Sequence, residues 1–364
     1  MGPAVGTQVI SAAFRAAGIE MIHVNTWDQR TVFNVGVLDF RNVRLGLLHA
    51  TEMAWKAFRH PVRLVYVPIS QSRWGYARDG LLIVIARSLR RPVVVHLHGA
   101  NLQEFFRAST RLERSLIRRT LRSVVLAIAL TPSLRTVYTG LVPPDRVRVL
   151  ENAIPDPWPK GIAHLLEARN KRASSGGELR LLFIANDFAT KGAGVAAEAL
   201  TTPGLQKAVL RMIGAPPSEV VRPLEQQAER LGVRGRLELL GGLVDDDKLR
   251  QYEWADIFVY PTENDAQPMV VLEAMAAGLP IVTTTQGGIL DTVADTAVVV
   301  ERGNPSDFRQ ALADLAANPD ERQRLGAAAR IRFLARYTPE HFQLRFEAVF
   351  SDLLSSVEGD RAAS

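Results

Sequence analysis

Short apolar runs alternate with longer amphipathic segments along the 364 residues of the chain. The run 92–97 (PVVVHL) is almost entirely apolar and β-branched, which is typical of a parallel strand buried on both faces. The other strand-length runs are 20–25, 64–69, 124–130, 147–150, 179–185, 208–213, 237–240, 257–260 and 280–284. Helical periodicity lies between them, over 192–200, 219–231, 268–277 and 305–315. This alternation predicts parallel sheets with helices on both faces, an α/β fold.

Three prolines, Pro155, Pro157 and Pro159, and the polar stretch ending in Gly176-Gly177 interrupt this alternation near the middle of the chain. They predict two Rossmann-like, doubly wound domains. The expected ranges are 1–155, a linker over 156–176, a second domain over 177–338, and a last helix within 339–364 that packs back on the first domain. Because ligands of such sheets bind at the carboxyl ends of the strands, we expect the active site in a cleft between the domains.

Composition restricts the chemistry that the chain can carry. It contains no cysteine, which excludes disulfides, thiolate metal sites and a cysteine nucleophile. No apolar run reaches the ~18–20 residues of a membrane span, and no signal peptide is recognised, so a cytoplasmic protein is expected. The charge is uneven: residues 1–160 hold 22 Arg and Lys against 10 acids, and the remainder 22 against 28. A basic first half predicts an anionic partner for that half.

Arginines recur at helical spacing after the 92–97 strand. They are Arg107, Arg111, Arg114, Arg118 and Arg122. Either they form a solvated helix face, or they contact anionic lipid head groups or a lipid diphosphate, with the protein then peripheral at the inner face of the cell membrane. Nucleic acid is not expected, because no basic module with interleaved aromatic residues accompanies the stripe.

The segment 260–288, YPTENDAQPMVVLEAMAAGLPIVTTTQGG, carries the most chemistry. A strand ends at Tyr260, and the loop after it holds Glu263 and Asp265. A helix then begins near Pro268, where free backbone N–H groups form an anion site. Glu273 follows on that helix and could accept hydrogen bonds from a ribose diol. The alternative is an ordinary acidic helix start with a surface glutamate.

Three further segments offer polar side chains. Lys191 follows the 179–185 strand, where a cation suits a pyrophosphate. His96 and His98 lie on one face at the end of the 92–97 strand; we expect a core role for His96 and a site role for His98. The pair could bind zinc, but no third ligand has suitable spacing, so no metal is expected. The acids 245–247 are expected to begin a helix rather than to bind a metal.

The 260–288 segment resembles glycosyltransferase family 4, the retaining enzymes of the two-domain GT-B fold. The family pattern is a Glu, seven residues, and a second Glu followed by Ala-Met-Ala-x-Gly-x-Pro. Here Asp265 stands first, Glu273 follows at that spacing, and AMAAGLP comes next. The resemblance implies that Asp265 faces the donor sugar and that Glu273 binds the nucleotide ribose. Asp265 replaces the common Glu, and Glu263 could take its role.

The resemblance extends over nearly the whole chain and implies further site residues. Lys191 would hold the donor diphosphate, with Asn186 where an arginine is usual. Gly6 and Thr7 would belong to a glycine-rich loop near the phosphates, although the strand expected before that loop is missing. His98 would orient the reacting sugar. The complete implied set is His98, Asp265 and Lys191 for catalysis, and Gly6, Thr7, Asn186, Lys191, Leu243, Val244, Glu263, Asp265, Gln267, Pro268, Met269 and Glu273 for donor binding.

The expected function is a metal-independent, retaining glycosyltransferase of cell-surface polysaccharide biosynthesis. It would move a sugar from a UDP- or GDP-linked donor to a saccharide or a polyprenyl-diphosphate-linked acceptor, with no cofactor besides the donor. Two alternatives stay open. A donor-binding partner subunit without activity would explain Asn186 and Asp265, and a nucleotide-sugar epimerase shares the two-domain layout.

Overall fold

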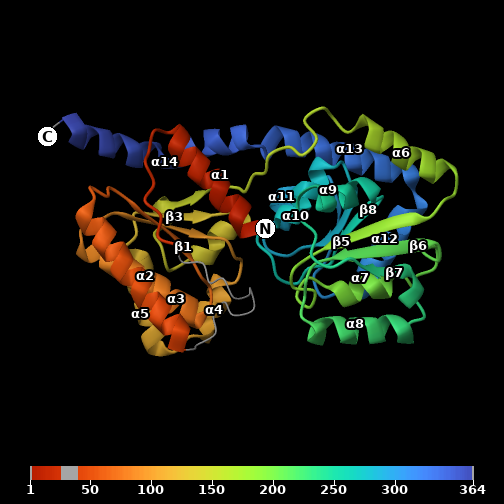
Figure 1. Ribbon diagram of the computed structural model, residues 1–364, viewed down its shortest axis with the longest axis horizontal. Helices are drawn as coiled ribbons and strands as arrows, with labels where there is room; N and C mark the ends of the chain where they lie inside the picture. The colour runs from red at the N-terminus through yellow and green to blue at the C-terminus, as the bar shows by residue number, and fades with distance from the viewer. Residues whose placement is uncertain (1, 26–39, 363–364) are drawn as a thin grey trace. The chain divides into compact units, whose positions relative to one another are not determined.

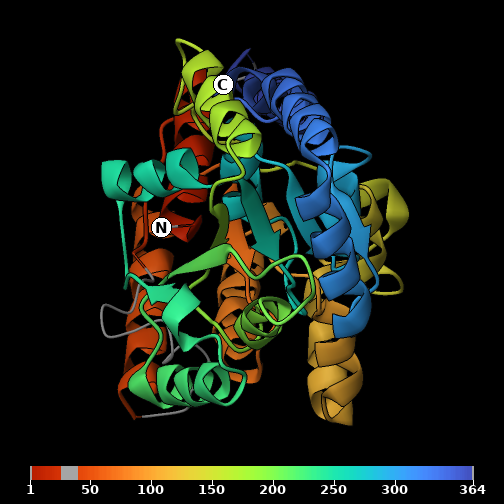
Figure 2. The same ribbon diagram turned by 90° about the vertical axis from the view of Figure 1, so that its right-hand side faces the viewer.

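The structure of the protein is a computed structural model that describes residues 2–25 and 40–362. The chain forms two compact units, Ile10–Glu151 with Gln343–Ser364 (the N-terminal unit) and Met1–Val9 with Asn152–Phe342 (the C-terminal unit). Each unit is built on one parallel β-sheet with helices packed on it (Figures 1 and 2). The predicted α/β class with two Rossmann-like parallel sheets is therefore confirmed. Among the described residues, no helix is both long and apolar enough to cross a bilayer.

The sheet of the N-terminal unit has four strands in the order β1-β2-β3-β4. They are β1 (Val65–Ile69), β2 (Val93–Leu97), β3 (Leu126–Ala129) and β4 (Val147–Val149). All five β2 residues are buried, as the β-branched pattern predicted. The prediction of a strand over 20–25 was wrong. These residues form no ladder and none is buried, because Ile22 and its neighbours have no sheet partner to cover them.

Two helix layers enclose this sheet. The helices are α1 (Gly2–Ala16), α2 (Phe40–Arg59), α3 (Arg73–Ser88), α4 (Leu102–Ala108), α5 (Arg111–Arg122) and α14 (Pro339–Ala362), with short 3₁₀ turns at Ser133–Tyr138 and Pro144–Arg146. Helices α2, α3 and α5 lie on one side of the sheet and α1 and α14 on the other (Figure 1). On the latter side, Phe14 packs edge-on against Phe346 and Phe350, with ring centroids 4.7 and 5.2 Å apart. This aromatic cluster holds the C-terminal helix on the N-terminal unit.

The sheet of the C-terminal unit has six strands in the order β10-β9-β8-β5-β6-β7. The strands are β5 (Leu179–Ile184), β6 (Ala208–Ile213), β7 (Leu237–Leu239), β8 (Ile257–Tyr260), β9 (Ile281–Thr284) and β10 (Val298–Val300), the last not predicted. The helices are α6 (Ala163–Ser174), α7 (Ala193–Ala199), α8 (Ser218–Arg230), α9 (Asp245–Trp254), α10 (Met269–Ala276), α11 (Ile289–Val293), α12 (Pro305–Ala317) and α13 (Pro319–Arg336), with a 3₁₀ turn at Arg234–Arg236. As predicted, three aspartates form the first turn of α9.

The range 156–176, expected to link two domains, holds helix α6 of the C-terminal unit. Arg169 of α6 is buried and donates four hydrogen bonds to backbone carbonyls, those of Tyr252, Ala255, Ala277 and Gly278. These carbonyls lie in the last turns of α9 and α10 or directly after them, where a helix leaves its carbonyls without partners. Arg169 therefore caps the C-terminal ends of both helices. These bonds also hold α6 on the C-terminal unit.

Candidate active site

The strand order of the C-terminal sheet reverses between β5 and β8, and the loops after these two strands meet there. Such a switch point opens a crevice at the carboxyl ends of the strands. The backbone N–H of Glu263 donates to the carbonyl of Thr190 over 2.9 Å. Gly192 has a φ of +78°, and a Cβ added there would lie 2.2 Å from the carbonyl oxygen of Pro261. The close contact of the two loops therefore requires glycine at this position.

Lys191 and Asp265, predicted separately from the sequence, form an ion pair at this crevice. Lys191 Nζ lies 3.0 Å from Asp265 Oδ2 and also donates to the backbone carbonyl of Asn264. The Tyr260 hydroxyl donates to the same Asp265 oxygen over 2.7 Å. Burial and the Asp265 carboxylate raise the pKa of Tyr260, so its hydroxyl keeps the proton that it donates. Asp265 is thus held in place from two sides.

The other predicted residues of these loops differ in exposure. The Glu263 side chain is exposed, whereas Asp265 is half-buried, so Asp265 is the better placed acid. Asn186 is also exposed. The turn after it is closed by Asp187, which accepts from the Thr190 hydroxyl over 2.6 Å and from the Ala189 backbone N–H over 3.2 Å. This Asx turn presents Lys191 at the end of the loop.

The Gly287-Gly288 pair packs against the backbone of the loop that holds Asp265. Gly288 N–H donates to the Ala266 carbonyl over 2.8 Å. Gly287 has a φ of +57°, and a Cβ there would lie 2.0 Å from the Asp265 carbonyl oxygen. A side chain at position 287 would therefore displace the acid that faces Lys191.

We expect Gly287→Ala to destabilise the C-terminal unit by about 2–3 kcal/mol and to weaken ligand binding at the Lys191 crevice. Urea unfolding and calorimetric titration measure the two effects. Gly303→Ala is the matched control, because Gly303 has a φ of +79° but open space where a Cβ would point. It should cost only the ~1 kcal/mol of backbone strain and leave binding unchanged. Equal binding by both variants would contradict the supporting role of Gly287.

Glu273, on the second turn of α10, is engaged by two residues of α9. Its Oε2 atom accepts from Lys248 Nζ and from the Tyr252 hydroxyl, each over 2.5 Å. Both bonds go to Oε2, so Oε1 can accept a hydrogen bond from a ligand. The sequence analysis missed Lys248 and Tyr252. The available signal was their i,i+4 spacing on α9, the helix that follows strand β7. This spacing places both side chains on one face of the helix.

The start of α10 lies at the same crevice. The first helical bonds are made by the N–H groups of Val271 and Leu272 to the carbonyl of Pro268. Helix geometry therefore leaves the N–H groups of Met269 and Val270 outside these bonds. Gln267 before them is buried, and its Oε1 accepts from the Asn152 backbone over 2.6 Å. Its Nε2 is buried and has no partner among the described residues.

Leu243 and Val244, expected beside the nucleotide base, follow β7 and precede α9. Leu243 is half-buried, and Val244 is half exposed as the N-cap of α9. Arg302, missed because strand β10 was not predicted, donates to the Glu263 carbonyl over 3.2 Å and to Gln286 Oε1 over 3.0 Å. It joins the loops that follow β8, β9 and β10.

In the N-terminal unit, the rings of His96 and His98 lie in contact at the carboxyl end of β2, with centroids 4.1 Å apart and planes tilted by 33°. His96 is buried, its Nδ1 lies 2.7 Å from the Tyr66 hydroxyl, and its Nε2 has no partner in the described part of the chain. Burial and the adjacent His98 hold the pKa of His96 well below its usual range, so His96 is neutral at pH 7. His98 is exposed, where it can meet a ligand.

The structure corrects two predictions in the N-terminal half. Gly6 and Thr7 lie in helix α1 and form no glycine-rich loop, because the helix that was expected to begin after them already begins at Gly2. The arginine stripe is also divided. Arg107 belongs to α4, whereas the other four lie on α5, which begins with a capping box between Thr110 and Glu113. Arg118 stacks on Phe106 of α4 at 5.0 Å.

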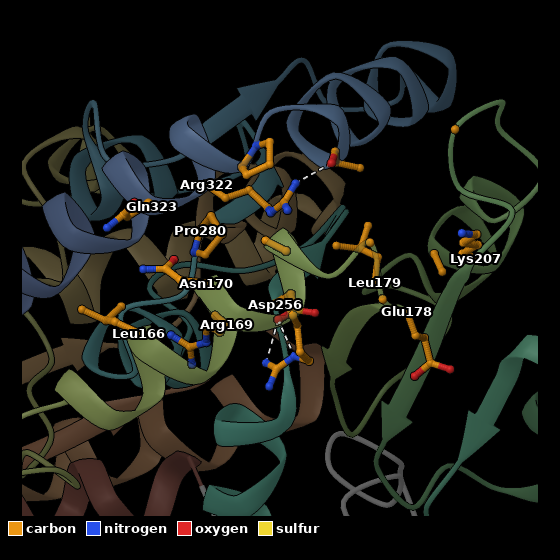
Figure 3. Close-up of a pocket in the computed structure, with 18 of the residues that line it drawn as sticks. Leu166, Arg169, Asn170, Glu178, Leu179, Lys207, Asp256, Pro280, Arg322 and Gln323 are labelled. Atoms are coloured by element: carbon orange, nitrogen blue, oxygen red, sulfur yellow. Dashed lines mark hydrogen bonds and ion pairs between the residues drawn. The ribbon is translucent and has the colours of Figure 1, made fainter.

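The C-terminal unit also has a cavity of about 440 Å³ at the opposite edge of the sheet, where β5 and β6 begin (Figure 3). The arginines around it are already bonded. Arg172 pairs with Asp256 at 2.7 Å, and Arg322 donates to the carbonyl of Leu315 over 3.1 Å and to that of Ala316. The carboxyl edge, with Lys191 and Glu273, is therefore the candidate site. No group of three His, Asp or Glu residues able to hold a metal occurs in the described residues.

Two Rossmann-like units, each built on a parallel sheet, make up the GT-B fold. Residues 166–332, within the C-terminal unit, match the family Glycosyl transferases group 1. The crystal structure of Anabaena Alr3699/HepE in complex with UDP-glucose superposes with a TM-score of 0.68 and 18% identity, over 85% of this chain and 84% of that one.

Curated relatives match in sequence as well. The D-inositol 3-phosphate glycosyltransferase of Geodermatophilus obscurus is 34% identical over 126 residues, which are 33% of this chain and 27% of the relative. The match thus spans little more than a quarter of that relative's length. The D-rhamnosyltransferase WbpZ of Pseudomonas aeruginosa is 26% identical over 264 residues, which are 71% of this chain and 66% of WbpZ.

Proposed function

We propose that the protein is a retaining glycosyltransferase of family 4 that uses a nucleotide-diphosphate sugar. The observation that carries the proposal is the Lys191–Asp265 pair at the switch point, with Glu273 on the adjoining helix. Together these groups offer a cation and helix N–H groups for a diphosphate, and carboxylates for a sugar and a ribose. The relative that binds UDP-glucose supports a nucleotide sugar as the ligand class.

In the proposed reaction, the bond between the sugar C1 and the diphosphate oxygen breaks, and a bond from C1 to the acceptor oxygen forms on the same face. Lys191 and the N–H groups of Met269 and Val270 stabilise the charge that develops on the departing diphosphate. Glu273 Oε1 accepts from a ribose hydroxyl. Asp265 binds the donor sugar and His98 orients it. The departing phosphate accepts the acceptor's proton, so no side-chain nucleophile or metal is required.

The acceptor is proposed from charge. The basic N-terminal half suits a polyprenyl-diphosphate-linked or an anionic saccharide acceptor. A cytoplasmic place in the biosynthesis of cell-surface polysaccharide accords with this acceptor class. The D-rhamnosyltransferase relative supports a sugar-transfer role of this kind.

The test is donor binding by Glu273→Gln, measured by calorimetry or saturation-transfer NMR with a panel of UDP- and GDP-sugars. We expect the wild type to select one nucleotide and the variant to bind it about 10–100-fold more weakly, since a bond to a charged acceptor contributes about 1.5–3 kcal/mol. Glu238→Gln is the matched control. Like Glu273, Glu238 forms an ion pair, but its partner is Arg211 and the pair lies on strands β6 and β7, away from α10. A folded wild type that binds no nucleotide sugar would refute the proposal.

A donor-binding partner subunit without activity is the second candidate. The exposed Asn186 favours it, because a cation is usual there in the family and the loop lacks one at that position. Selective donor binding without turnover, for any acceptor tested, would favour this alternative. Release of an epimerised nucleotide sugar would instead indicate an epimerase.

A further inference from the structure

Exposed apolar side chains are concentrated on one layer of helices in the N-terminal unit. Fifteen large apolar side chains are exposed among the described residues, and nine of them lie on α2, α3 and α5. The most prominent are Leu47, Trp55, Phe58, Trp74, Leu81 and Leu112, which we call the apolar helix face. Phe58 and Leu112 are 83% and 81% exposed. An apolar surface of this extent marks an interaction site in a water-exposed protein.

The three helices lie side by side, with α3 between the other two (Figure 2). On α3 the exposed residues Trp74, Ala77, Leu81 and Val84 recur every three or four positions and so form one stripe on the side opposite the buried residues. A shallow apolar groove between Trp74 and Leu116 joins this stripe to α5. The apolar helix face is therefore continuous across α3 and α5.

The charges around the apolar helix face are almost all positive. The three helices contain twelve arginines and lysines but only three acids. Each acid is already engaged: Glu52 pairs with Lys56, Glu113 with Arg73, and Asp79 is buried beside Arg78. Arg119 and Arg122 are exposed on the outer side of α5. The surface thus combines exposed aromatic and aliphatic side chains with a cationic surround.

We propose that the apolar helix face docks on the surface of an anionic membrane. Trp, Phe and Leu would enter the boundary between head groups and acyl chains, while the arginines contact lipid phosphates. A second copy of the chain would place two cationic surfaces against each other, which charge repulsion disfavours. The proposal is independent of glycosyl transfer, although an acceptor anchored in lipid would be reached from such a position. It assigns membrane contact to α2 and α3 as well as to the arginines of α5.

The test is flotation of the full chain with vesicles of phosphatidylcholine alone or of equal parts phosphatidylcholine and phosphatidylglycerol. We expect binding to the anionic vesicles only, weakening as salt is added. The variant Phe58→Ser/Leu112→Ser should bind at least roughly tenfold more weakly, because two side chains lose their burial. Arg119→Glu/Arg122→Glu should lose a similar factor at low salt and less at high salt.

The control is Ile331→Ser/Leu344→Ser, which removes two side chains of similar exposure, 68% and 66%, from α13 and α14. It should bind like the wild type, and circular dichroism shows whether each variant is folded. Absence of vesicle binding by the folded wild type, or an equal loss in the control, would overturn the proposal. A dimer of the wild type that Phe58→Ser/Leu112→Ser dissociates, with vesicle binding unchanged, would instead assign the face to a second copy.

Discussion

Replacing Lys191 by methionine is expected to lower kcat/KM for the proposed glycosyl transfer by about 100- to 1000-fold, the usual effect of removing a group that stabilises transition-state charge. Methionine keeps the length and most of the volume of lysine but removes the charge. The loss should be large here because the position where the family usually has an arginine holds the neutral Asn186, so this loop supplies one cation instead of two. Steady-state kinetics with the donor identified by the binding panel measures the effect.

Lys207→Met is the matched control for this prediction. Lys207 is exposed beside the start of β6, at the opposite edge of the same sheet, and should tolerate the change without loss of activity. Lys191→Arg separates charge from geometry and should recover only part of the rate, because guanidinium has a different shape and reach. An active Lys191→Met enzyme would show that another cation holds the diphosphate.

Replacing Arg169 by leucine is expected to cost about 3–5 kcal/mol of the free energy of unfolding of the C-terminal unit. Four carbonyl oxygens at two helix ends would lose their donor in a buried place. Burial lowers the pKa of Arg169 to about 10, so the guanidinium is still charged at neutral pH and its hydrogen bonds are charge-assisted. Urea unfolding followed by circular dichroism measures the loss.

Lys171→Leu is the control on the same helix, since Lys171 is exposed two residues further along. A change within about 0.5 kcal/mol is expected there. If Arg169→Leu unfolds at the same urea concentration as Lys171→Leu, the hydrogen bonds to the helix ends contribute no net stability. Arg169→Lys should recover little, because one ammonium cannot reach carbonyls at both helix ends.

The strands were largely predictable because burial on both faces leaves a strong local pattern. The runs 92–97 and 257–260 became β2 and β8 because each is almost entirely apolar or aromatic and buried, as expected of a central parallel strand. The run 20–25 (EMIHVN) mixes apolar with polar residues and has no partner in the described sheet. Strand β10 was not predicted, although its three valines are β-branched; it is only three residues long and lies half-buried on the edge of the sheet. Whether an apolar run becomes a strand thus depends on a neighbour distant in sequence, as with Leu181 of β5 and Ile257 of β8.

The candidate site was predicted as separate residues, and their mutual contacts came only from the folded chain. Lys191, Asp265 and Glu273 were recognised from spacing and resemblance. The partners Tyr260, Lys248 and Tyr252 were not, because nothing local distinguishes a tyrosine that orients a carboxylate from one that fills a core. Gly287 shows the same limit, because the reason for glycine there is the carbonyl oxygen of Asp265, 22 positions earlier.

By itself the sequence determined the α/β class, most strands, the absence of cysteine chemistry and the resemblance on which the proposed donor site rests, because hydrophobic periodicity and short motifs are local properties. Only the tertiary structure decided that the range 156–176 contains helix α6 of the C-terminal unit and that Gly6 and Thr7 are helical. It also decided that the arginine stripe is divided between α4 and α5, and that nine exposed apolar side chains share one helix layer. Each of these depends on which residues distant in sequence become neighbours, and packing and hydrogen bonding across the fold decide that.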